Sequence, residues 1–368
     1  MARHNISLLL SACIPLLTVA VTPSTGCRAG GSPPIAPGGT KRFSMQSPDA
    51  TQLGGNATRW YWLNIPNTYE PAKPAMLVFV FHGFYDNGHM EMWEDSIPTF
   101  VNENGKNVVS VYPIGSHDGG DSASWNVEGG GLNLKPGPLG HICGTPRRGS
   151  QMYTCYDSCT KSEAGCNPHL GCDASSCMDD RGFIKRLLTS ITESVCIDLD
   201  AVHLTGISMG GQMVLQTALD LAPQIASIAP VAGARYWGYM RSPPSPVAIL
   251  DVHGRRDHTI PANTTTFQGP AGAAVSSDYF YYHPTPHHLN AFAGANGCSN
   301  KSNLPYPTAY DGTRDLACNQ PHGKCSLGSV VQCVGDWGHT WPLYKTHPLA
   351  YAELALSFFE THPRTRHN

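Results

Sequence analysis

The chain has 368 residues, of which 41% are hydrophobic and 14% are charged, and its formal net charge at pH 7 is −3. This hydrophobic content is ordinary for a protein with a sizeable buried core. The charge balance gives no basic stripe, so neither nucleic acid nor an anionic membrane surface is expected as the main partner.

The N-terminus has the pattern of a secretory signal peptide. A short basic head at residues 1–5 precedes an apolar run at residues 6–21 that has small residues near its end. A membrane anchor is the alternative, but this run is shorter than the roughly 20 residues that cross a bilayer. We expect residues 1–20 to be removed on export and the mature protein to be extracellular and free of the membrane. Glycan acceptor triplets for a eukaryotic host begin at Asn56, Asn263 and Asn300.

The cysteine content also favours an extracellular, oxidising compartment. Apart from Cys13 in the signal peptide there are twelve, an even number that suits complete disulfide pairing. Half of them lie in residues 143–177, a segment with almost no aliphatic side chains, which needs cross-links to hold a structure. A zinc site is the alternative there, but export favours disulfides. The cysteines expected in disulfides are Cys27, Cys143, Cys155, Cys159, Cys166, Cys172, Cys177, Cys196, Cys298, Cys318, Cys325 and Cys333.

Residues 21–40 are rich in Pro, Gly and Ser and predict an extended leader, followed by a folded domain over residues 41–368. Short apolar runs in that domain predict buried strands, and apolar residues at helical spacing predict helices. The predicted strands are 60–65, 76–81, 108–112, 201–207, 225–232, 247–252 and 330–334, and the clearest helices are 180–195, 209–221 and 348–360. This alternation predicts a mostly parallel sheet with helices on both faces and ligands beyond the carboxyl ends of its strands.

A G-x-S-x-G motif at residues 206–210 predicts a nucleophile at Ser208. The motif is short enough to arise by chance, but a strand-like stretch precedes it and a helix-like stretch follows it. Glycines at both ends let the strand turn sharply into the helix, which exposes the serine hydroxyl. The alternative is a serine that only caps a helix.

A serine hydroxyl reacts only when a base takes its proton, and a carboxylate must orient that base. In α/β-hydrolases the acid and then the histidine follow the serine, each on a loop after a later strand. Asp257 follows the strand at 247–252 and His339 follows the strand at 330–334. We therefore predict a triad of Ser208, Asp257 and His339.

Other residues near these loops are weaker candidates. Asp251 lies inside a predicted strand, which makes it the poorer acid, while His253 and His258 flank the acid loop and are alternative bases. The oxyanion needs two backbone N–H donors, one from the residue after the nucleophile and one from an early strand-to-helix loop. The predicted donors are the backbone N–H groups of Met209 and Phe84. The alternative for the second is that the turn before Phe84 is an ordinary strand end with no catalytic role.

Seven sequence blocks occur in an order typical of one group of secreted esterases. They are His82-Gly83, residues 112–115 with Ser124-Trp125-Asn126-Val127, residues 179–184, the elbow at 206–213, residues 253–257, Asn296-Gly297-Cys298, and residues 338–342. On these blocks the chain resembles the polyhydroxybutyrate depolymerases, feruloyl esterases and acetylxylan esterases. The resemblance covers nearly all of the chain from about Trp60 and implies the α/β-hydrolase fold and the same triad. Phe84 and the cysteine-rich insertion at 143–177 depart from the group's pattern.

Together these observations predict a secreted serine carboxylic-ester hydrolase that needs no metal or organic cofactor. Loop tryptophans, on which a substrate ring could stack, favour feruloyl or acetyl esters of plant cell-wall polysaccharide; they are Trp125, Trp337 and Trp341. A polyester (polyhydroxyalkanoate) depolymerase is the nearest alternative, and a serine peptidase would use the same groups. An inactive secreted binding module is the alternative of another class. The insertion at 143–177 is either part of the active-site rim or only structural.

Overall fold

A computed structural model describes most of the chain. The described residues are 21–28, 32–47, 58–86, 89, 92, 94–118, 122–130, 136–144, 155–160, 174–265, 269–299, 302–308, 316–342 and 347–364. The predicted signal peptide, two predicted disulfide cysteines and two predicted glycan sites lie outside them: residues 1–20, Cys166, Cys172, Asn56 and Asn300. The remaining glycan site, Asn263, is exposed.

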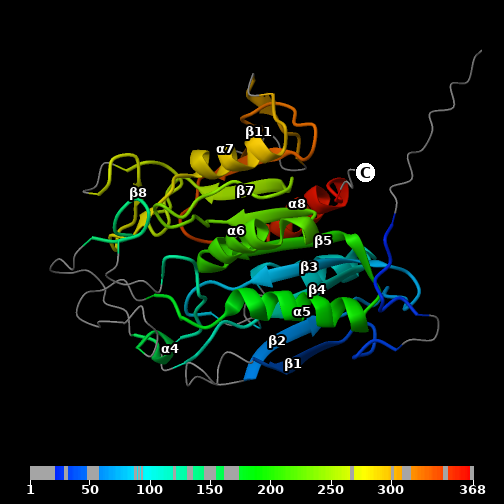
Figure 1. Cartoon of the computed structure of the whole chain (residues 1–368). Helices are drawn as coiled ribbons and strands as arrows, with labels where there is room; N and C mark the ends of the chain where they lie inside the picture. The colour runs from blue at the N-terminus through cyan, green and yellow to red at the C-terminus, as the bar shows by residue number, and fades with distance from the viewer. Residues whose placement is uncertain are drawn as a thin grey trace, which may run out of the picture.

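Ten strands in the described part of the chain form one central sheet, in the order β1-β2-β4-β3-β5-β6-β7-β12-β11-β10 (Figure 1). The six strands from β4 to β12 run parallel, and two strands at each edge pair antiparallel. Their bounds are β1 Thr40–Gln46, β2 Thr58–Asn64, β3 Ala75–Phe81, β4 Val108–Pro113, β5 Ile197–Ile207, β6 Ser227–Val231, β7 Ala248–Gly254, β10 Leu304–Pro305, β11 Leu316–Gln320 and β12 Val330–Gly335. A separate hairpin pairs β8 Ala274–Val275 with β9 Tyr281–Tyr282.

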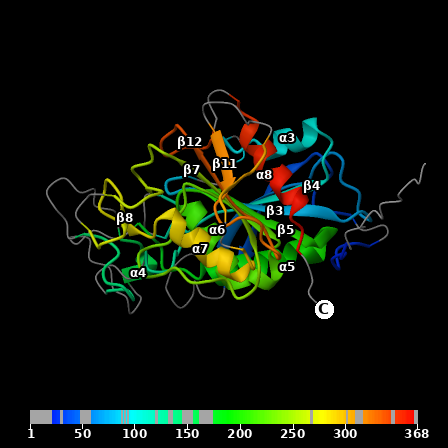
Figure 2. The ribbon, with the colours of Figure 1, turned by 90° about the horizontal axis from the view of Figure 1, so that it is seen from above.

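Helices cover both faces of the sheet. Figure 2 shows α5, α6 and α7 on one side and α3 and α8 on the other. The helix bounds are α3 Ile97–Glu103, α4 Asp157–Thr160, α5 Asp180–Ser194, α6 Met209–Leu221, α7 Thr285–Ala295 and α8 Ala350–Thr361, with a short 3₁₀ helix at Ala222–Gln224. The predicted mostly parallel sheet with helices on both faces is confirmed.

The central strands are apolar on both faces, as the sequence predicts. In β3, Leu77, Phe79 and Phe81 pack with α5, α6 and α7, whereas Val78 and Val80 pack with α3 and α8. Successive side chains of a strand point to opposite faces, so a strand between two helical layers must be apolar at every position. The carboxyl ends of these parallel strands lie along one side of the sheet, and the loops that follow them can carry reactive groups.

Residues 21–28 lie against the start of β5 instead of extending freely. Ser24 is buried, and its backbone N–H donates to the Ile197 carbonyl at 2.8 Å. A Cβ on Gly26 would lie 2.2 Å from the Val195 carbonyl oxygen, so only glycine fits there. A disulfide from Cys27 to Cys196 fixes the segment.

Disulfides cross-link the described residues at several places. Four pairs are Cys27–Cys196, Cys159–Cys177, Cys298–Cys325 and Cys318–Cys333. Cys143 and Cys155 are also disulfide-bonded. The four insertion cysteines that the structure describes are therefore oxidised, which removes their thiolates as zinc ligands. No helix in the described ranges is long and apolar enough to cross a membrane.

Candidate active site

The predicted nucleophile lies at a sharp turn between β5 and α6. Ser208 has φ 60° and ψ −124°, a conformation that is rare for a residue with a side chain. Its backbone is fixed on both sides, because its N–H donates to the Val231 carbonyl at 2.9 Å and its carbonyl accepts from Gln212 at 3.0 Å. A Cβ on Gly210 would lie 2.0 Å from the Phe81 carbonyl oxygen, so glycine is required for α6 to approach β3. Strained backbone of this kind persists where surrounding structure fixes it and is common at functional sites.

The predicted acid and base are hydrogen-bonded to each other. His339 Nδ1 lies 2.8 Å from Asp257 Oδ2, which makes Nδ1–H the donor. The other carboxylate oxygen, Oδ1, accepts the N–H groups of Thr259 and Ile260, each at 2.9 Å. Asp257 is 4% exposed. Three hydrogen bonds therefore hold a buried carboxylate in one orientation and direct the imidazole.

The second nitrogen of the imidazole is available for proton transfer. His339 Nε2 is buried and has no hydrogen-bond partner among the described residues, and no bond to the Ser208 hydroxyl is present in this part of the chain. The loops that carry the acid and the base are tightly packed, because a Cβ on Gly254 would lie 2.3 Å from the Trp337 carbonyl oxygen. The strands β5, β6, β7 and β12 are consecutive neighbours. Their carboxyl ends bring Ser208, Asp257 and His339 to one edge of the sheet.

The predicted oxyanion loop also borders the nucleophile. A Cβ on Gly83 would lie 3.4 Å from Ser208 Cβ, which places the turn before Phe84 directly beside the serine. Met209 is the first residue of α6, so its N–H lies at the positive end of the helix dipole. Both predicted donors thus belong to segments that adjoin Ser208.

Buried groups hold this loop in place. His82 is fully buried; its Nδ1 lies 2.7 Å from the Gly83 carbonyl oxygen and its Nε2 accepts the Gly115 N–H at 2.9 Å. Burial lowers the pKa of His82 to about 4, so the ring is neutral and Nε2 can accept. Trp125 Nε1 donates to the His82 carbonyl at 2.9 Å. Sequence reasoning used His82 only as part of a motif and missed this clamping role, which depends on contacts with distant residues.

No protein-family model matches the chain. Among curated proteins, it is 28% identical over 183 residues to feruloyl esterase B of Piromyces equi, covering 46% of this chain and 32% of that protein. It is 25% identical over 250 residues to feruloyl esterase D of Neurospora crassa, covering 68% and 67%. An 81-residue stretch is 30% identical to a bifunctional acetylxylan esterase/xylanase of Neocallimastix patriciarum, covering 22% of this chain and 12% of that protein. The chain thus spans about a third of the length of the first relative and two-thirds of the second.

A solved structure supports the same relationship at the level of fold. The acetyl xylan esterase from Aspergillus awamori superposes with a TM-score of 0.51 at 14% identity, covering 87% of this chain and 99% of that one. The chain has the α/β-hydrolase fold and is similar in sequence to feruloyl and acetylxylan esterases. The predicted resemblance to feruloyl and acetylxylan esterases is confirmed.

The structure contradicts a substrate-stacking role for two of the three predicted tryptophans. Trp125 is 0% exposed and packs edge-on against Phe81 at 5.5 Å, and Trp341 is 2% exposed and packs against Tyr351 at 4.5 Å. The sequence placed these rings in loops but could not show that the loops fold inward over the core. Trp337 remains partly exposed.

The alternative acid, Asp251, and the alternative bases, His253 and His258, have other surroundings. His253 is fully buried, with Nε2 2.9 Å from the Ile260 carbonyl oxygen and Nδ1 3.6 Å from Asp251. Burial acts to lower the pKa of His253, but the adjacent Asp251 and Asp257 outweigh it and raise the pKa. His258 is exposed. Of the candidate histidines, His339 has the shortest contact with a candidate acid in the described chain.

Proposed function

We propose that this hydrolase cleaves carboxylic esters through a covalent acyl-enzyme on Ser208, with His339 as general base and Asp257 as the carboxylate that orients it. The observation that carries the proposal is the 2.8 Å contact between His339 and Asp257, at the sheet edge where the strained Ser208 lies. A half-buried elbow serine on the same side of the sheet as an oriented imidazole is the arrangement from which acyl transfer can proceed.

In the first step, His339 Nε2 takes the Ser208 hydroxyl proton as the oxygen attacks the ester carbonyl. The N–H groups of Met209 and Phe84 stabilise the oxyanion, and the dipole of α6 adds positive potential there. His339, now an imidazolium steadied by Asp257, gives its proton to the departing alcohol.

In the second step, water enters where the alcohol left. His339 takes a proton from this water, whose oxygen attacks the acyl carbon, and the same two N–H groups stabilise the second oxyanion. The proton then passes to Ser208, and a carboxylic acid is released. Each bond made or broken in this cycle involves only the chain, the ester and water.

The proposed substrates are feruloyl or acetyl esters of plant cell-wall polysaccharide. Two curated relatives are named feruloyl esterase, and the third relative and the superposed structure are named acetylxylan esterase. The proposed location is extracellular, after removal of residues 1–20. Disulfides throughout the described chain favour an oxidising compartment. N-terminal sequencing of the secreted protein gives a start near residue 21 if this is correct.

Replacing the nucleophile tests the chemistry directly. Ser208→Ala is expected to lower kcat on methyl ferulate by at least about a thousandfold, because the oxyanion hole and binding alone remain. The variant also stops labelling by a fluorophosphonate probe, which reacts only with an activated serine. The matched control is Ser194→Ala, at an exposed position at the end of α5, which keeps full activity and labelling. Retention of most activity in Ser208→Ala overturns the proposal.

A substrate panel tests the acyl specificity. Wild-type protein is assayed on methyl ferulate, acetylated xylan and polyhydroxybutyrate at equal concentrations of ester bonds. The proposal predicts a higher kcat/KM on the first or second than on the polyester. A preference for polyhydroxybutyrate would instead identify a polyester depolymerase that uses the same triad.

A further inference from the structure

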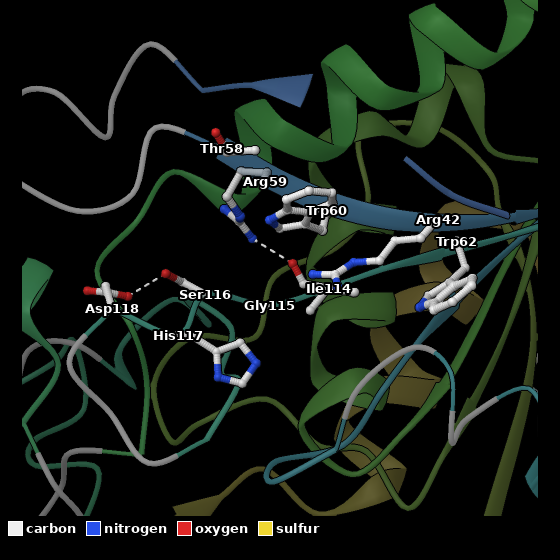
Figure 3. A pocket seen from close by; sticks show the side chains of 10 residues that line it. All are labelled: Arg42, Thr58, Arg59, Trp60, Trp62, Ile114, Gly115, Ser116, His117 and Asp118. Atoms are coloured by element: carbon white, nitrogen blue, oxygen red, sulfur yellow. Dashed lines mark hydrogen bonds between the residues drawn. The ribbon is translucent and has the colours of Figure 1, made fainter. Parts of the chain in front are cut away.

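A concave site lies on β1, β2 and β4, apart from the side chains of the proposed triad. It is a cavity of about 450 Å³ at the carboxyl end of β4, bounded by β1, β2 and the segment that follows β4 (Figure 3). This volume falls in the range of small-molecule sites. The proposed acyl-transfer mechanism uses none of its side chains.

In the part of the chain that is described, the side chains around the cavity leave positive charge without a partner, whereas the negative charges are already hydrogen-bonded. Arg42 is exposed and has no carboxylate partner within the described ranges, and its guanidinium and the His117 imidazole approach the same space in Figure 3. Burial, and then the charge of Arg42, lower the pKa of His117. Arg59 is 3% exposed, and its Nη1 has no hydrogen-bond partner among the described atoms. Three nitrogen-rich groups therefore converge there.

The nearby carboxylates are already engaged. Asp118 accepts the Ser116 hydroxyl and, at 2.7 Å, the Ser158 N–H. Asp180 pairs with Arg59 and accepts the Asn126 N–H at 2.5 Å. The charge of Arg42 is left uncompensated, and a guanidinium binds a carboxylate through two parallel hydrogen bonds. The ligand should thus carry a carboxylate.

Two tryptophan rings add flat apolar surface to the walls of the cavity. Trp60 and Trp62 occupy alternate positions of β2, so both face the same side of the strand, and both are partly exposed. The Arg42 guanidinium carbon lies 4.1 Å from the Trp60 ring centre, within cation–π distance. Indole surfaces with a polar fringe suit a ring that has one apolar face and polar edges, as a pyranose has.

The cavity touches the proposed oxyanion loop. Gly115 lines the cavity, and its N–H donates to His82 Nε2 at 2.9 Å. His82 and Gly83 form the turn that precedes Phe84, the predicted oxyanion donor. Ser158 and Cys177, from the cysteine-rich insertion, support the same wall, because the Ser158 hydroxyl accepts the Cys177 N–H at 2.9 Å while Ser158 N–H reaches Asp118. Gly115 and the turn beside Ser208 are thus joined through His82, so a sugar bound in the cavity lies on the same side of the sheet as the proposed nucleophile.

We infer that this cavity is a subsite for a sugar residue that bears a carboxylate, a uronic acid, attached to the same polysaccharide as the ester. This inference rests on the proposed function, since it takes the polysaccharide as the carrier of the ester. It assigns the hydrolase a preference for esters that lie close to an acidic sugar.

Binding is measured by titration calorimetry on Ser208→Ala protein, so that no ligand is consumed. The probes are a xylo-oligosaccharide with one glucuronic acid branch and the same oligosaccharide without it. The branched probe should bind on the order of tenfold more tightly, the size expected for one charge-assisted contact. Adding Arg42→Gln should remove the difference. Lys41→Gln, which makes the same charge change one position away on the other face of β1, should leave the difference intact.

The outcomes separate this inference from the proposed function. Equal affinity for both probes, a difference that survives Arg42→Gln, or an equal loss from Lys41→Gln overturns the subsite. Wild-type hydrolysis of methyl ferulate is measured in parallel. Hydrolysis without preference for the acidic probe overturns the subsite alone, whereas preference without hydrolysis supports the subsite and overturns the catalytic proposal. Circular dichroism confirms that each variant is folded.

Discussion

At the scale of single residues, the candidate site depends on groups whose neighbours restrict them to one arrangement. Ser208 has an unfavourable backbone conformation that two backbone hydrogen bonds hold. Asp257 is oriented by two N–H donors and then orients His339. Asp251, inside β7 and before Asp257 in the chain, differs: both of its carboxylate oxygens are buried without a hydrogen-bond partner in the described chain.

Asp257→Asn tests the orienting role. An amide in place of the carboxylate favours the wrong imidazole tautomer, so we expect kcat on methyl ferulate to fall about ten-thousandfold with little change in KM. Asp251→Asn is the matched control, with the same change inside the strand that precedes the Asp257 loop, and should retain activity to within about tenfold. Steady-state kinetics decide the matter, and a larger loss from Asp251→Asn would reassign the acid.

At the scale of elements, local sequence patterns predicted the buried strands and helices well, and the partly exposed edge strands of the sheet poorly. The helix expected at 180–195 is α5, in which Phe183, Leu187 and Ile191 are buried and Asp179 caps the first turn by accepting the Gly182 N–H at 2.8 Å. The edge strands β1 and β11 were missed, because they are partly exposed and lack a continuous apolar run. The loop after β3 depends on a contact from another element, since Trp125 supports it.

Trp125→Phe tests that support. The substitution keeps most of the apolar volume but leaves the buried His82 carbonyl without its donor, which should cost about 1–3 kcal/mol of unfolding free energy. We expect kcat to fall more than KM rises, because a displaced loop weakens oxyanion stabilisation and not ground-state binding. The control is Trp237→Phe, at another buried tryptophan that lies outside this loop. It should lower stability but leave kcat unchanged. Equal kcat values in the two variants would exclude the clamping role.

At the scale of the whole molecule, covalent and electrostatic features tie distant segments together. The disulfide Cys27–Cys196 joins the first described segment to β5 across a sequence separation of 169, whereas Cys318–Cys333 spans only 15 residues between neighbouring strands. Several fully buried histidines also lie in the core, among them His203, whose Nδ1 is 2.8 Å from the Ser227 hydroxyl.

Removing each disulfide by double Cys→Ala substitution should destabilise the protein unequally. The chain-entropy relation gives about 5 kcal/mol for the long loop of Cys27–Cys196 and about 3 kcal/mol for the short loop of Cys318–Cys333. Urea unfolding of both variants measures the difference, and the short-loop pair serves as the control for losing two cysteines. A smaller loss from the long loop would show that residues 21–28 contribute little to the fold.

Buried His203 predicts a pH dependence. Burial lowers its pKa from 6.5 to about 3, so below pH 6.5 the unfolded chain binds a proton that the folded protein does not. Its contribution to stability therefore decreases as pH falls through this window. Relative to His203→Gln, the wild-type unfolding free energy should drop by about 2 kcal/mol between pH 7 and pH 5, while the exposed control His141→Gln should follow the wild type. Parallel pH profiles for wild type and His203→Gln would contradict this.

The sequence by itself determined the central strands, the helices α5, α6 and α8, the elbow at Ser208 and the order of the proposed triad, because periodicity and turn chemistry are local. Only the tertiary structure decided that His339 reaches Asp257, that Trp125 and Trp341 point into the core, and that residues 21–28 lie along β5. It also formed the cavity of Arg42, Trp60 and His117 from three separate segments. The physical reason is that the direction and burial of a loop side chain depend on which distant segments pack against it, and no local pattern records that.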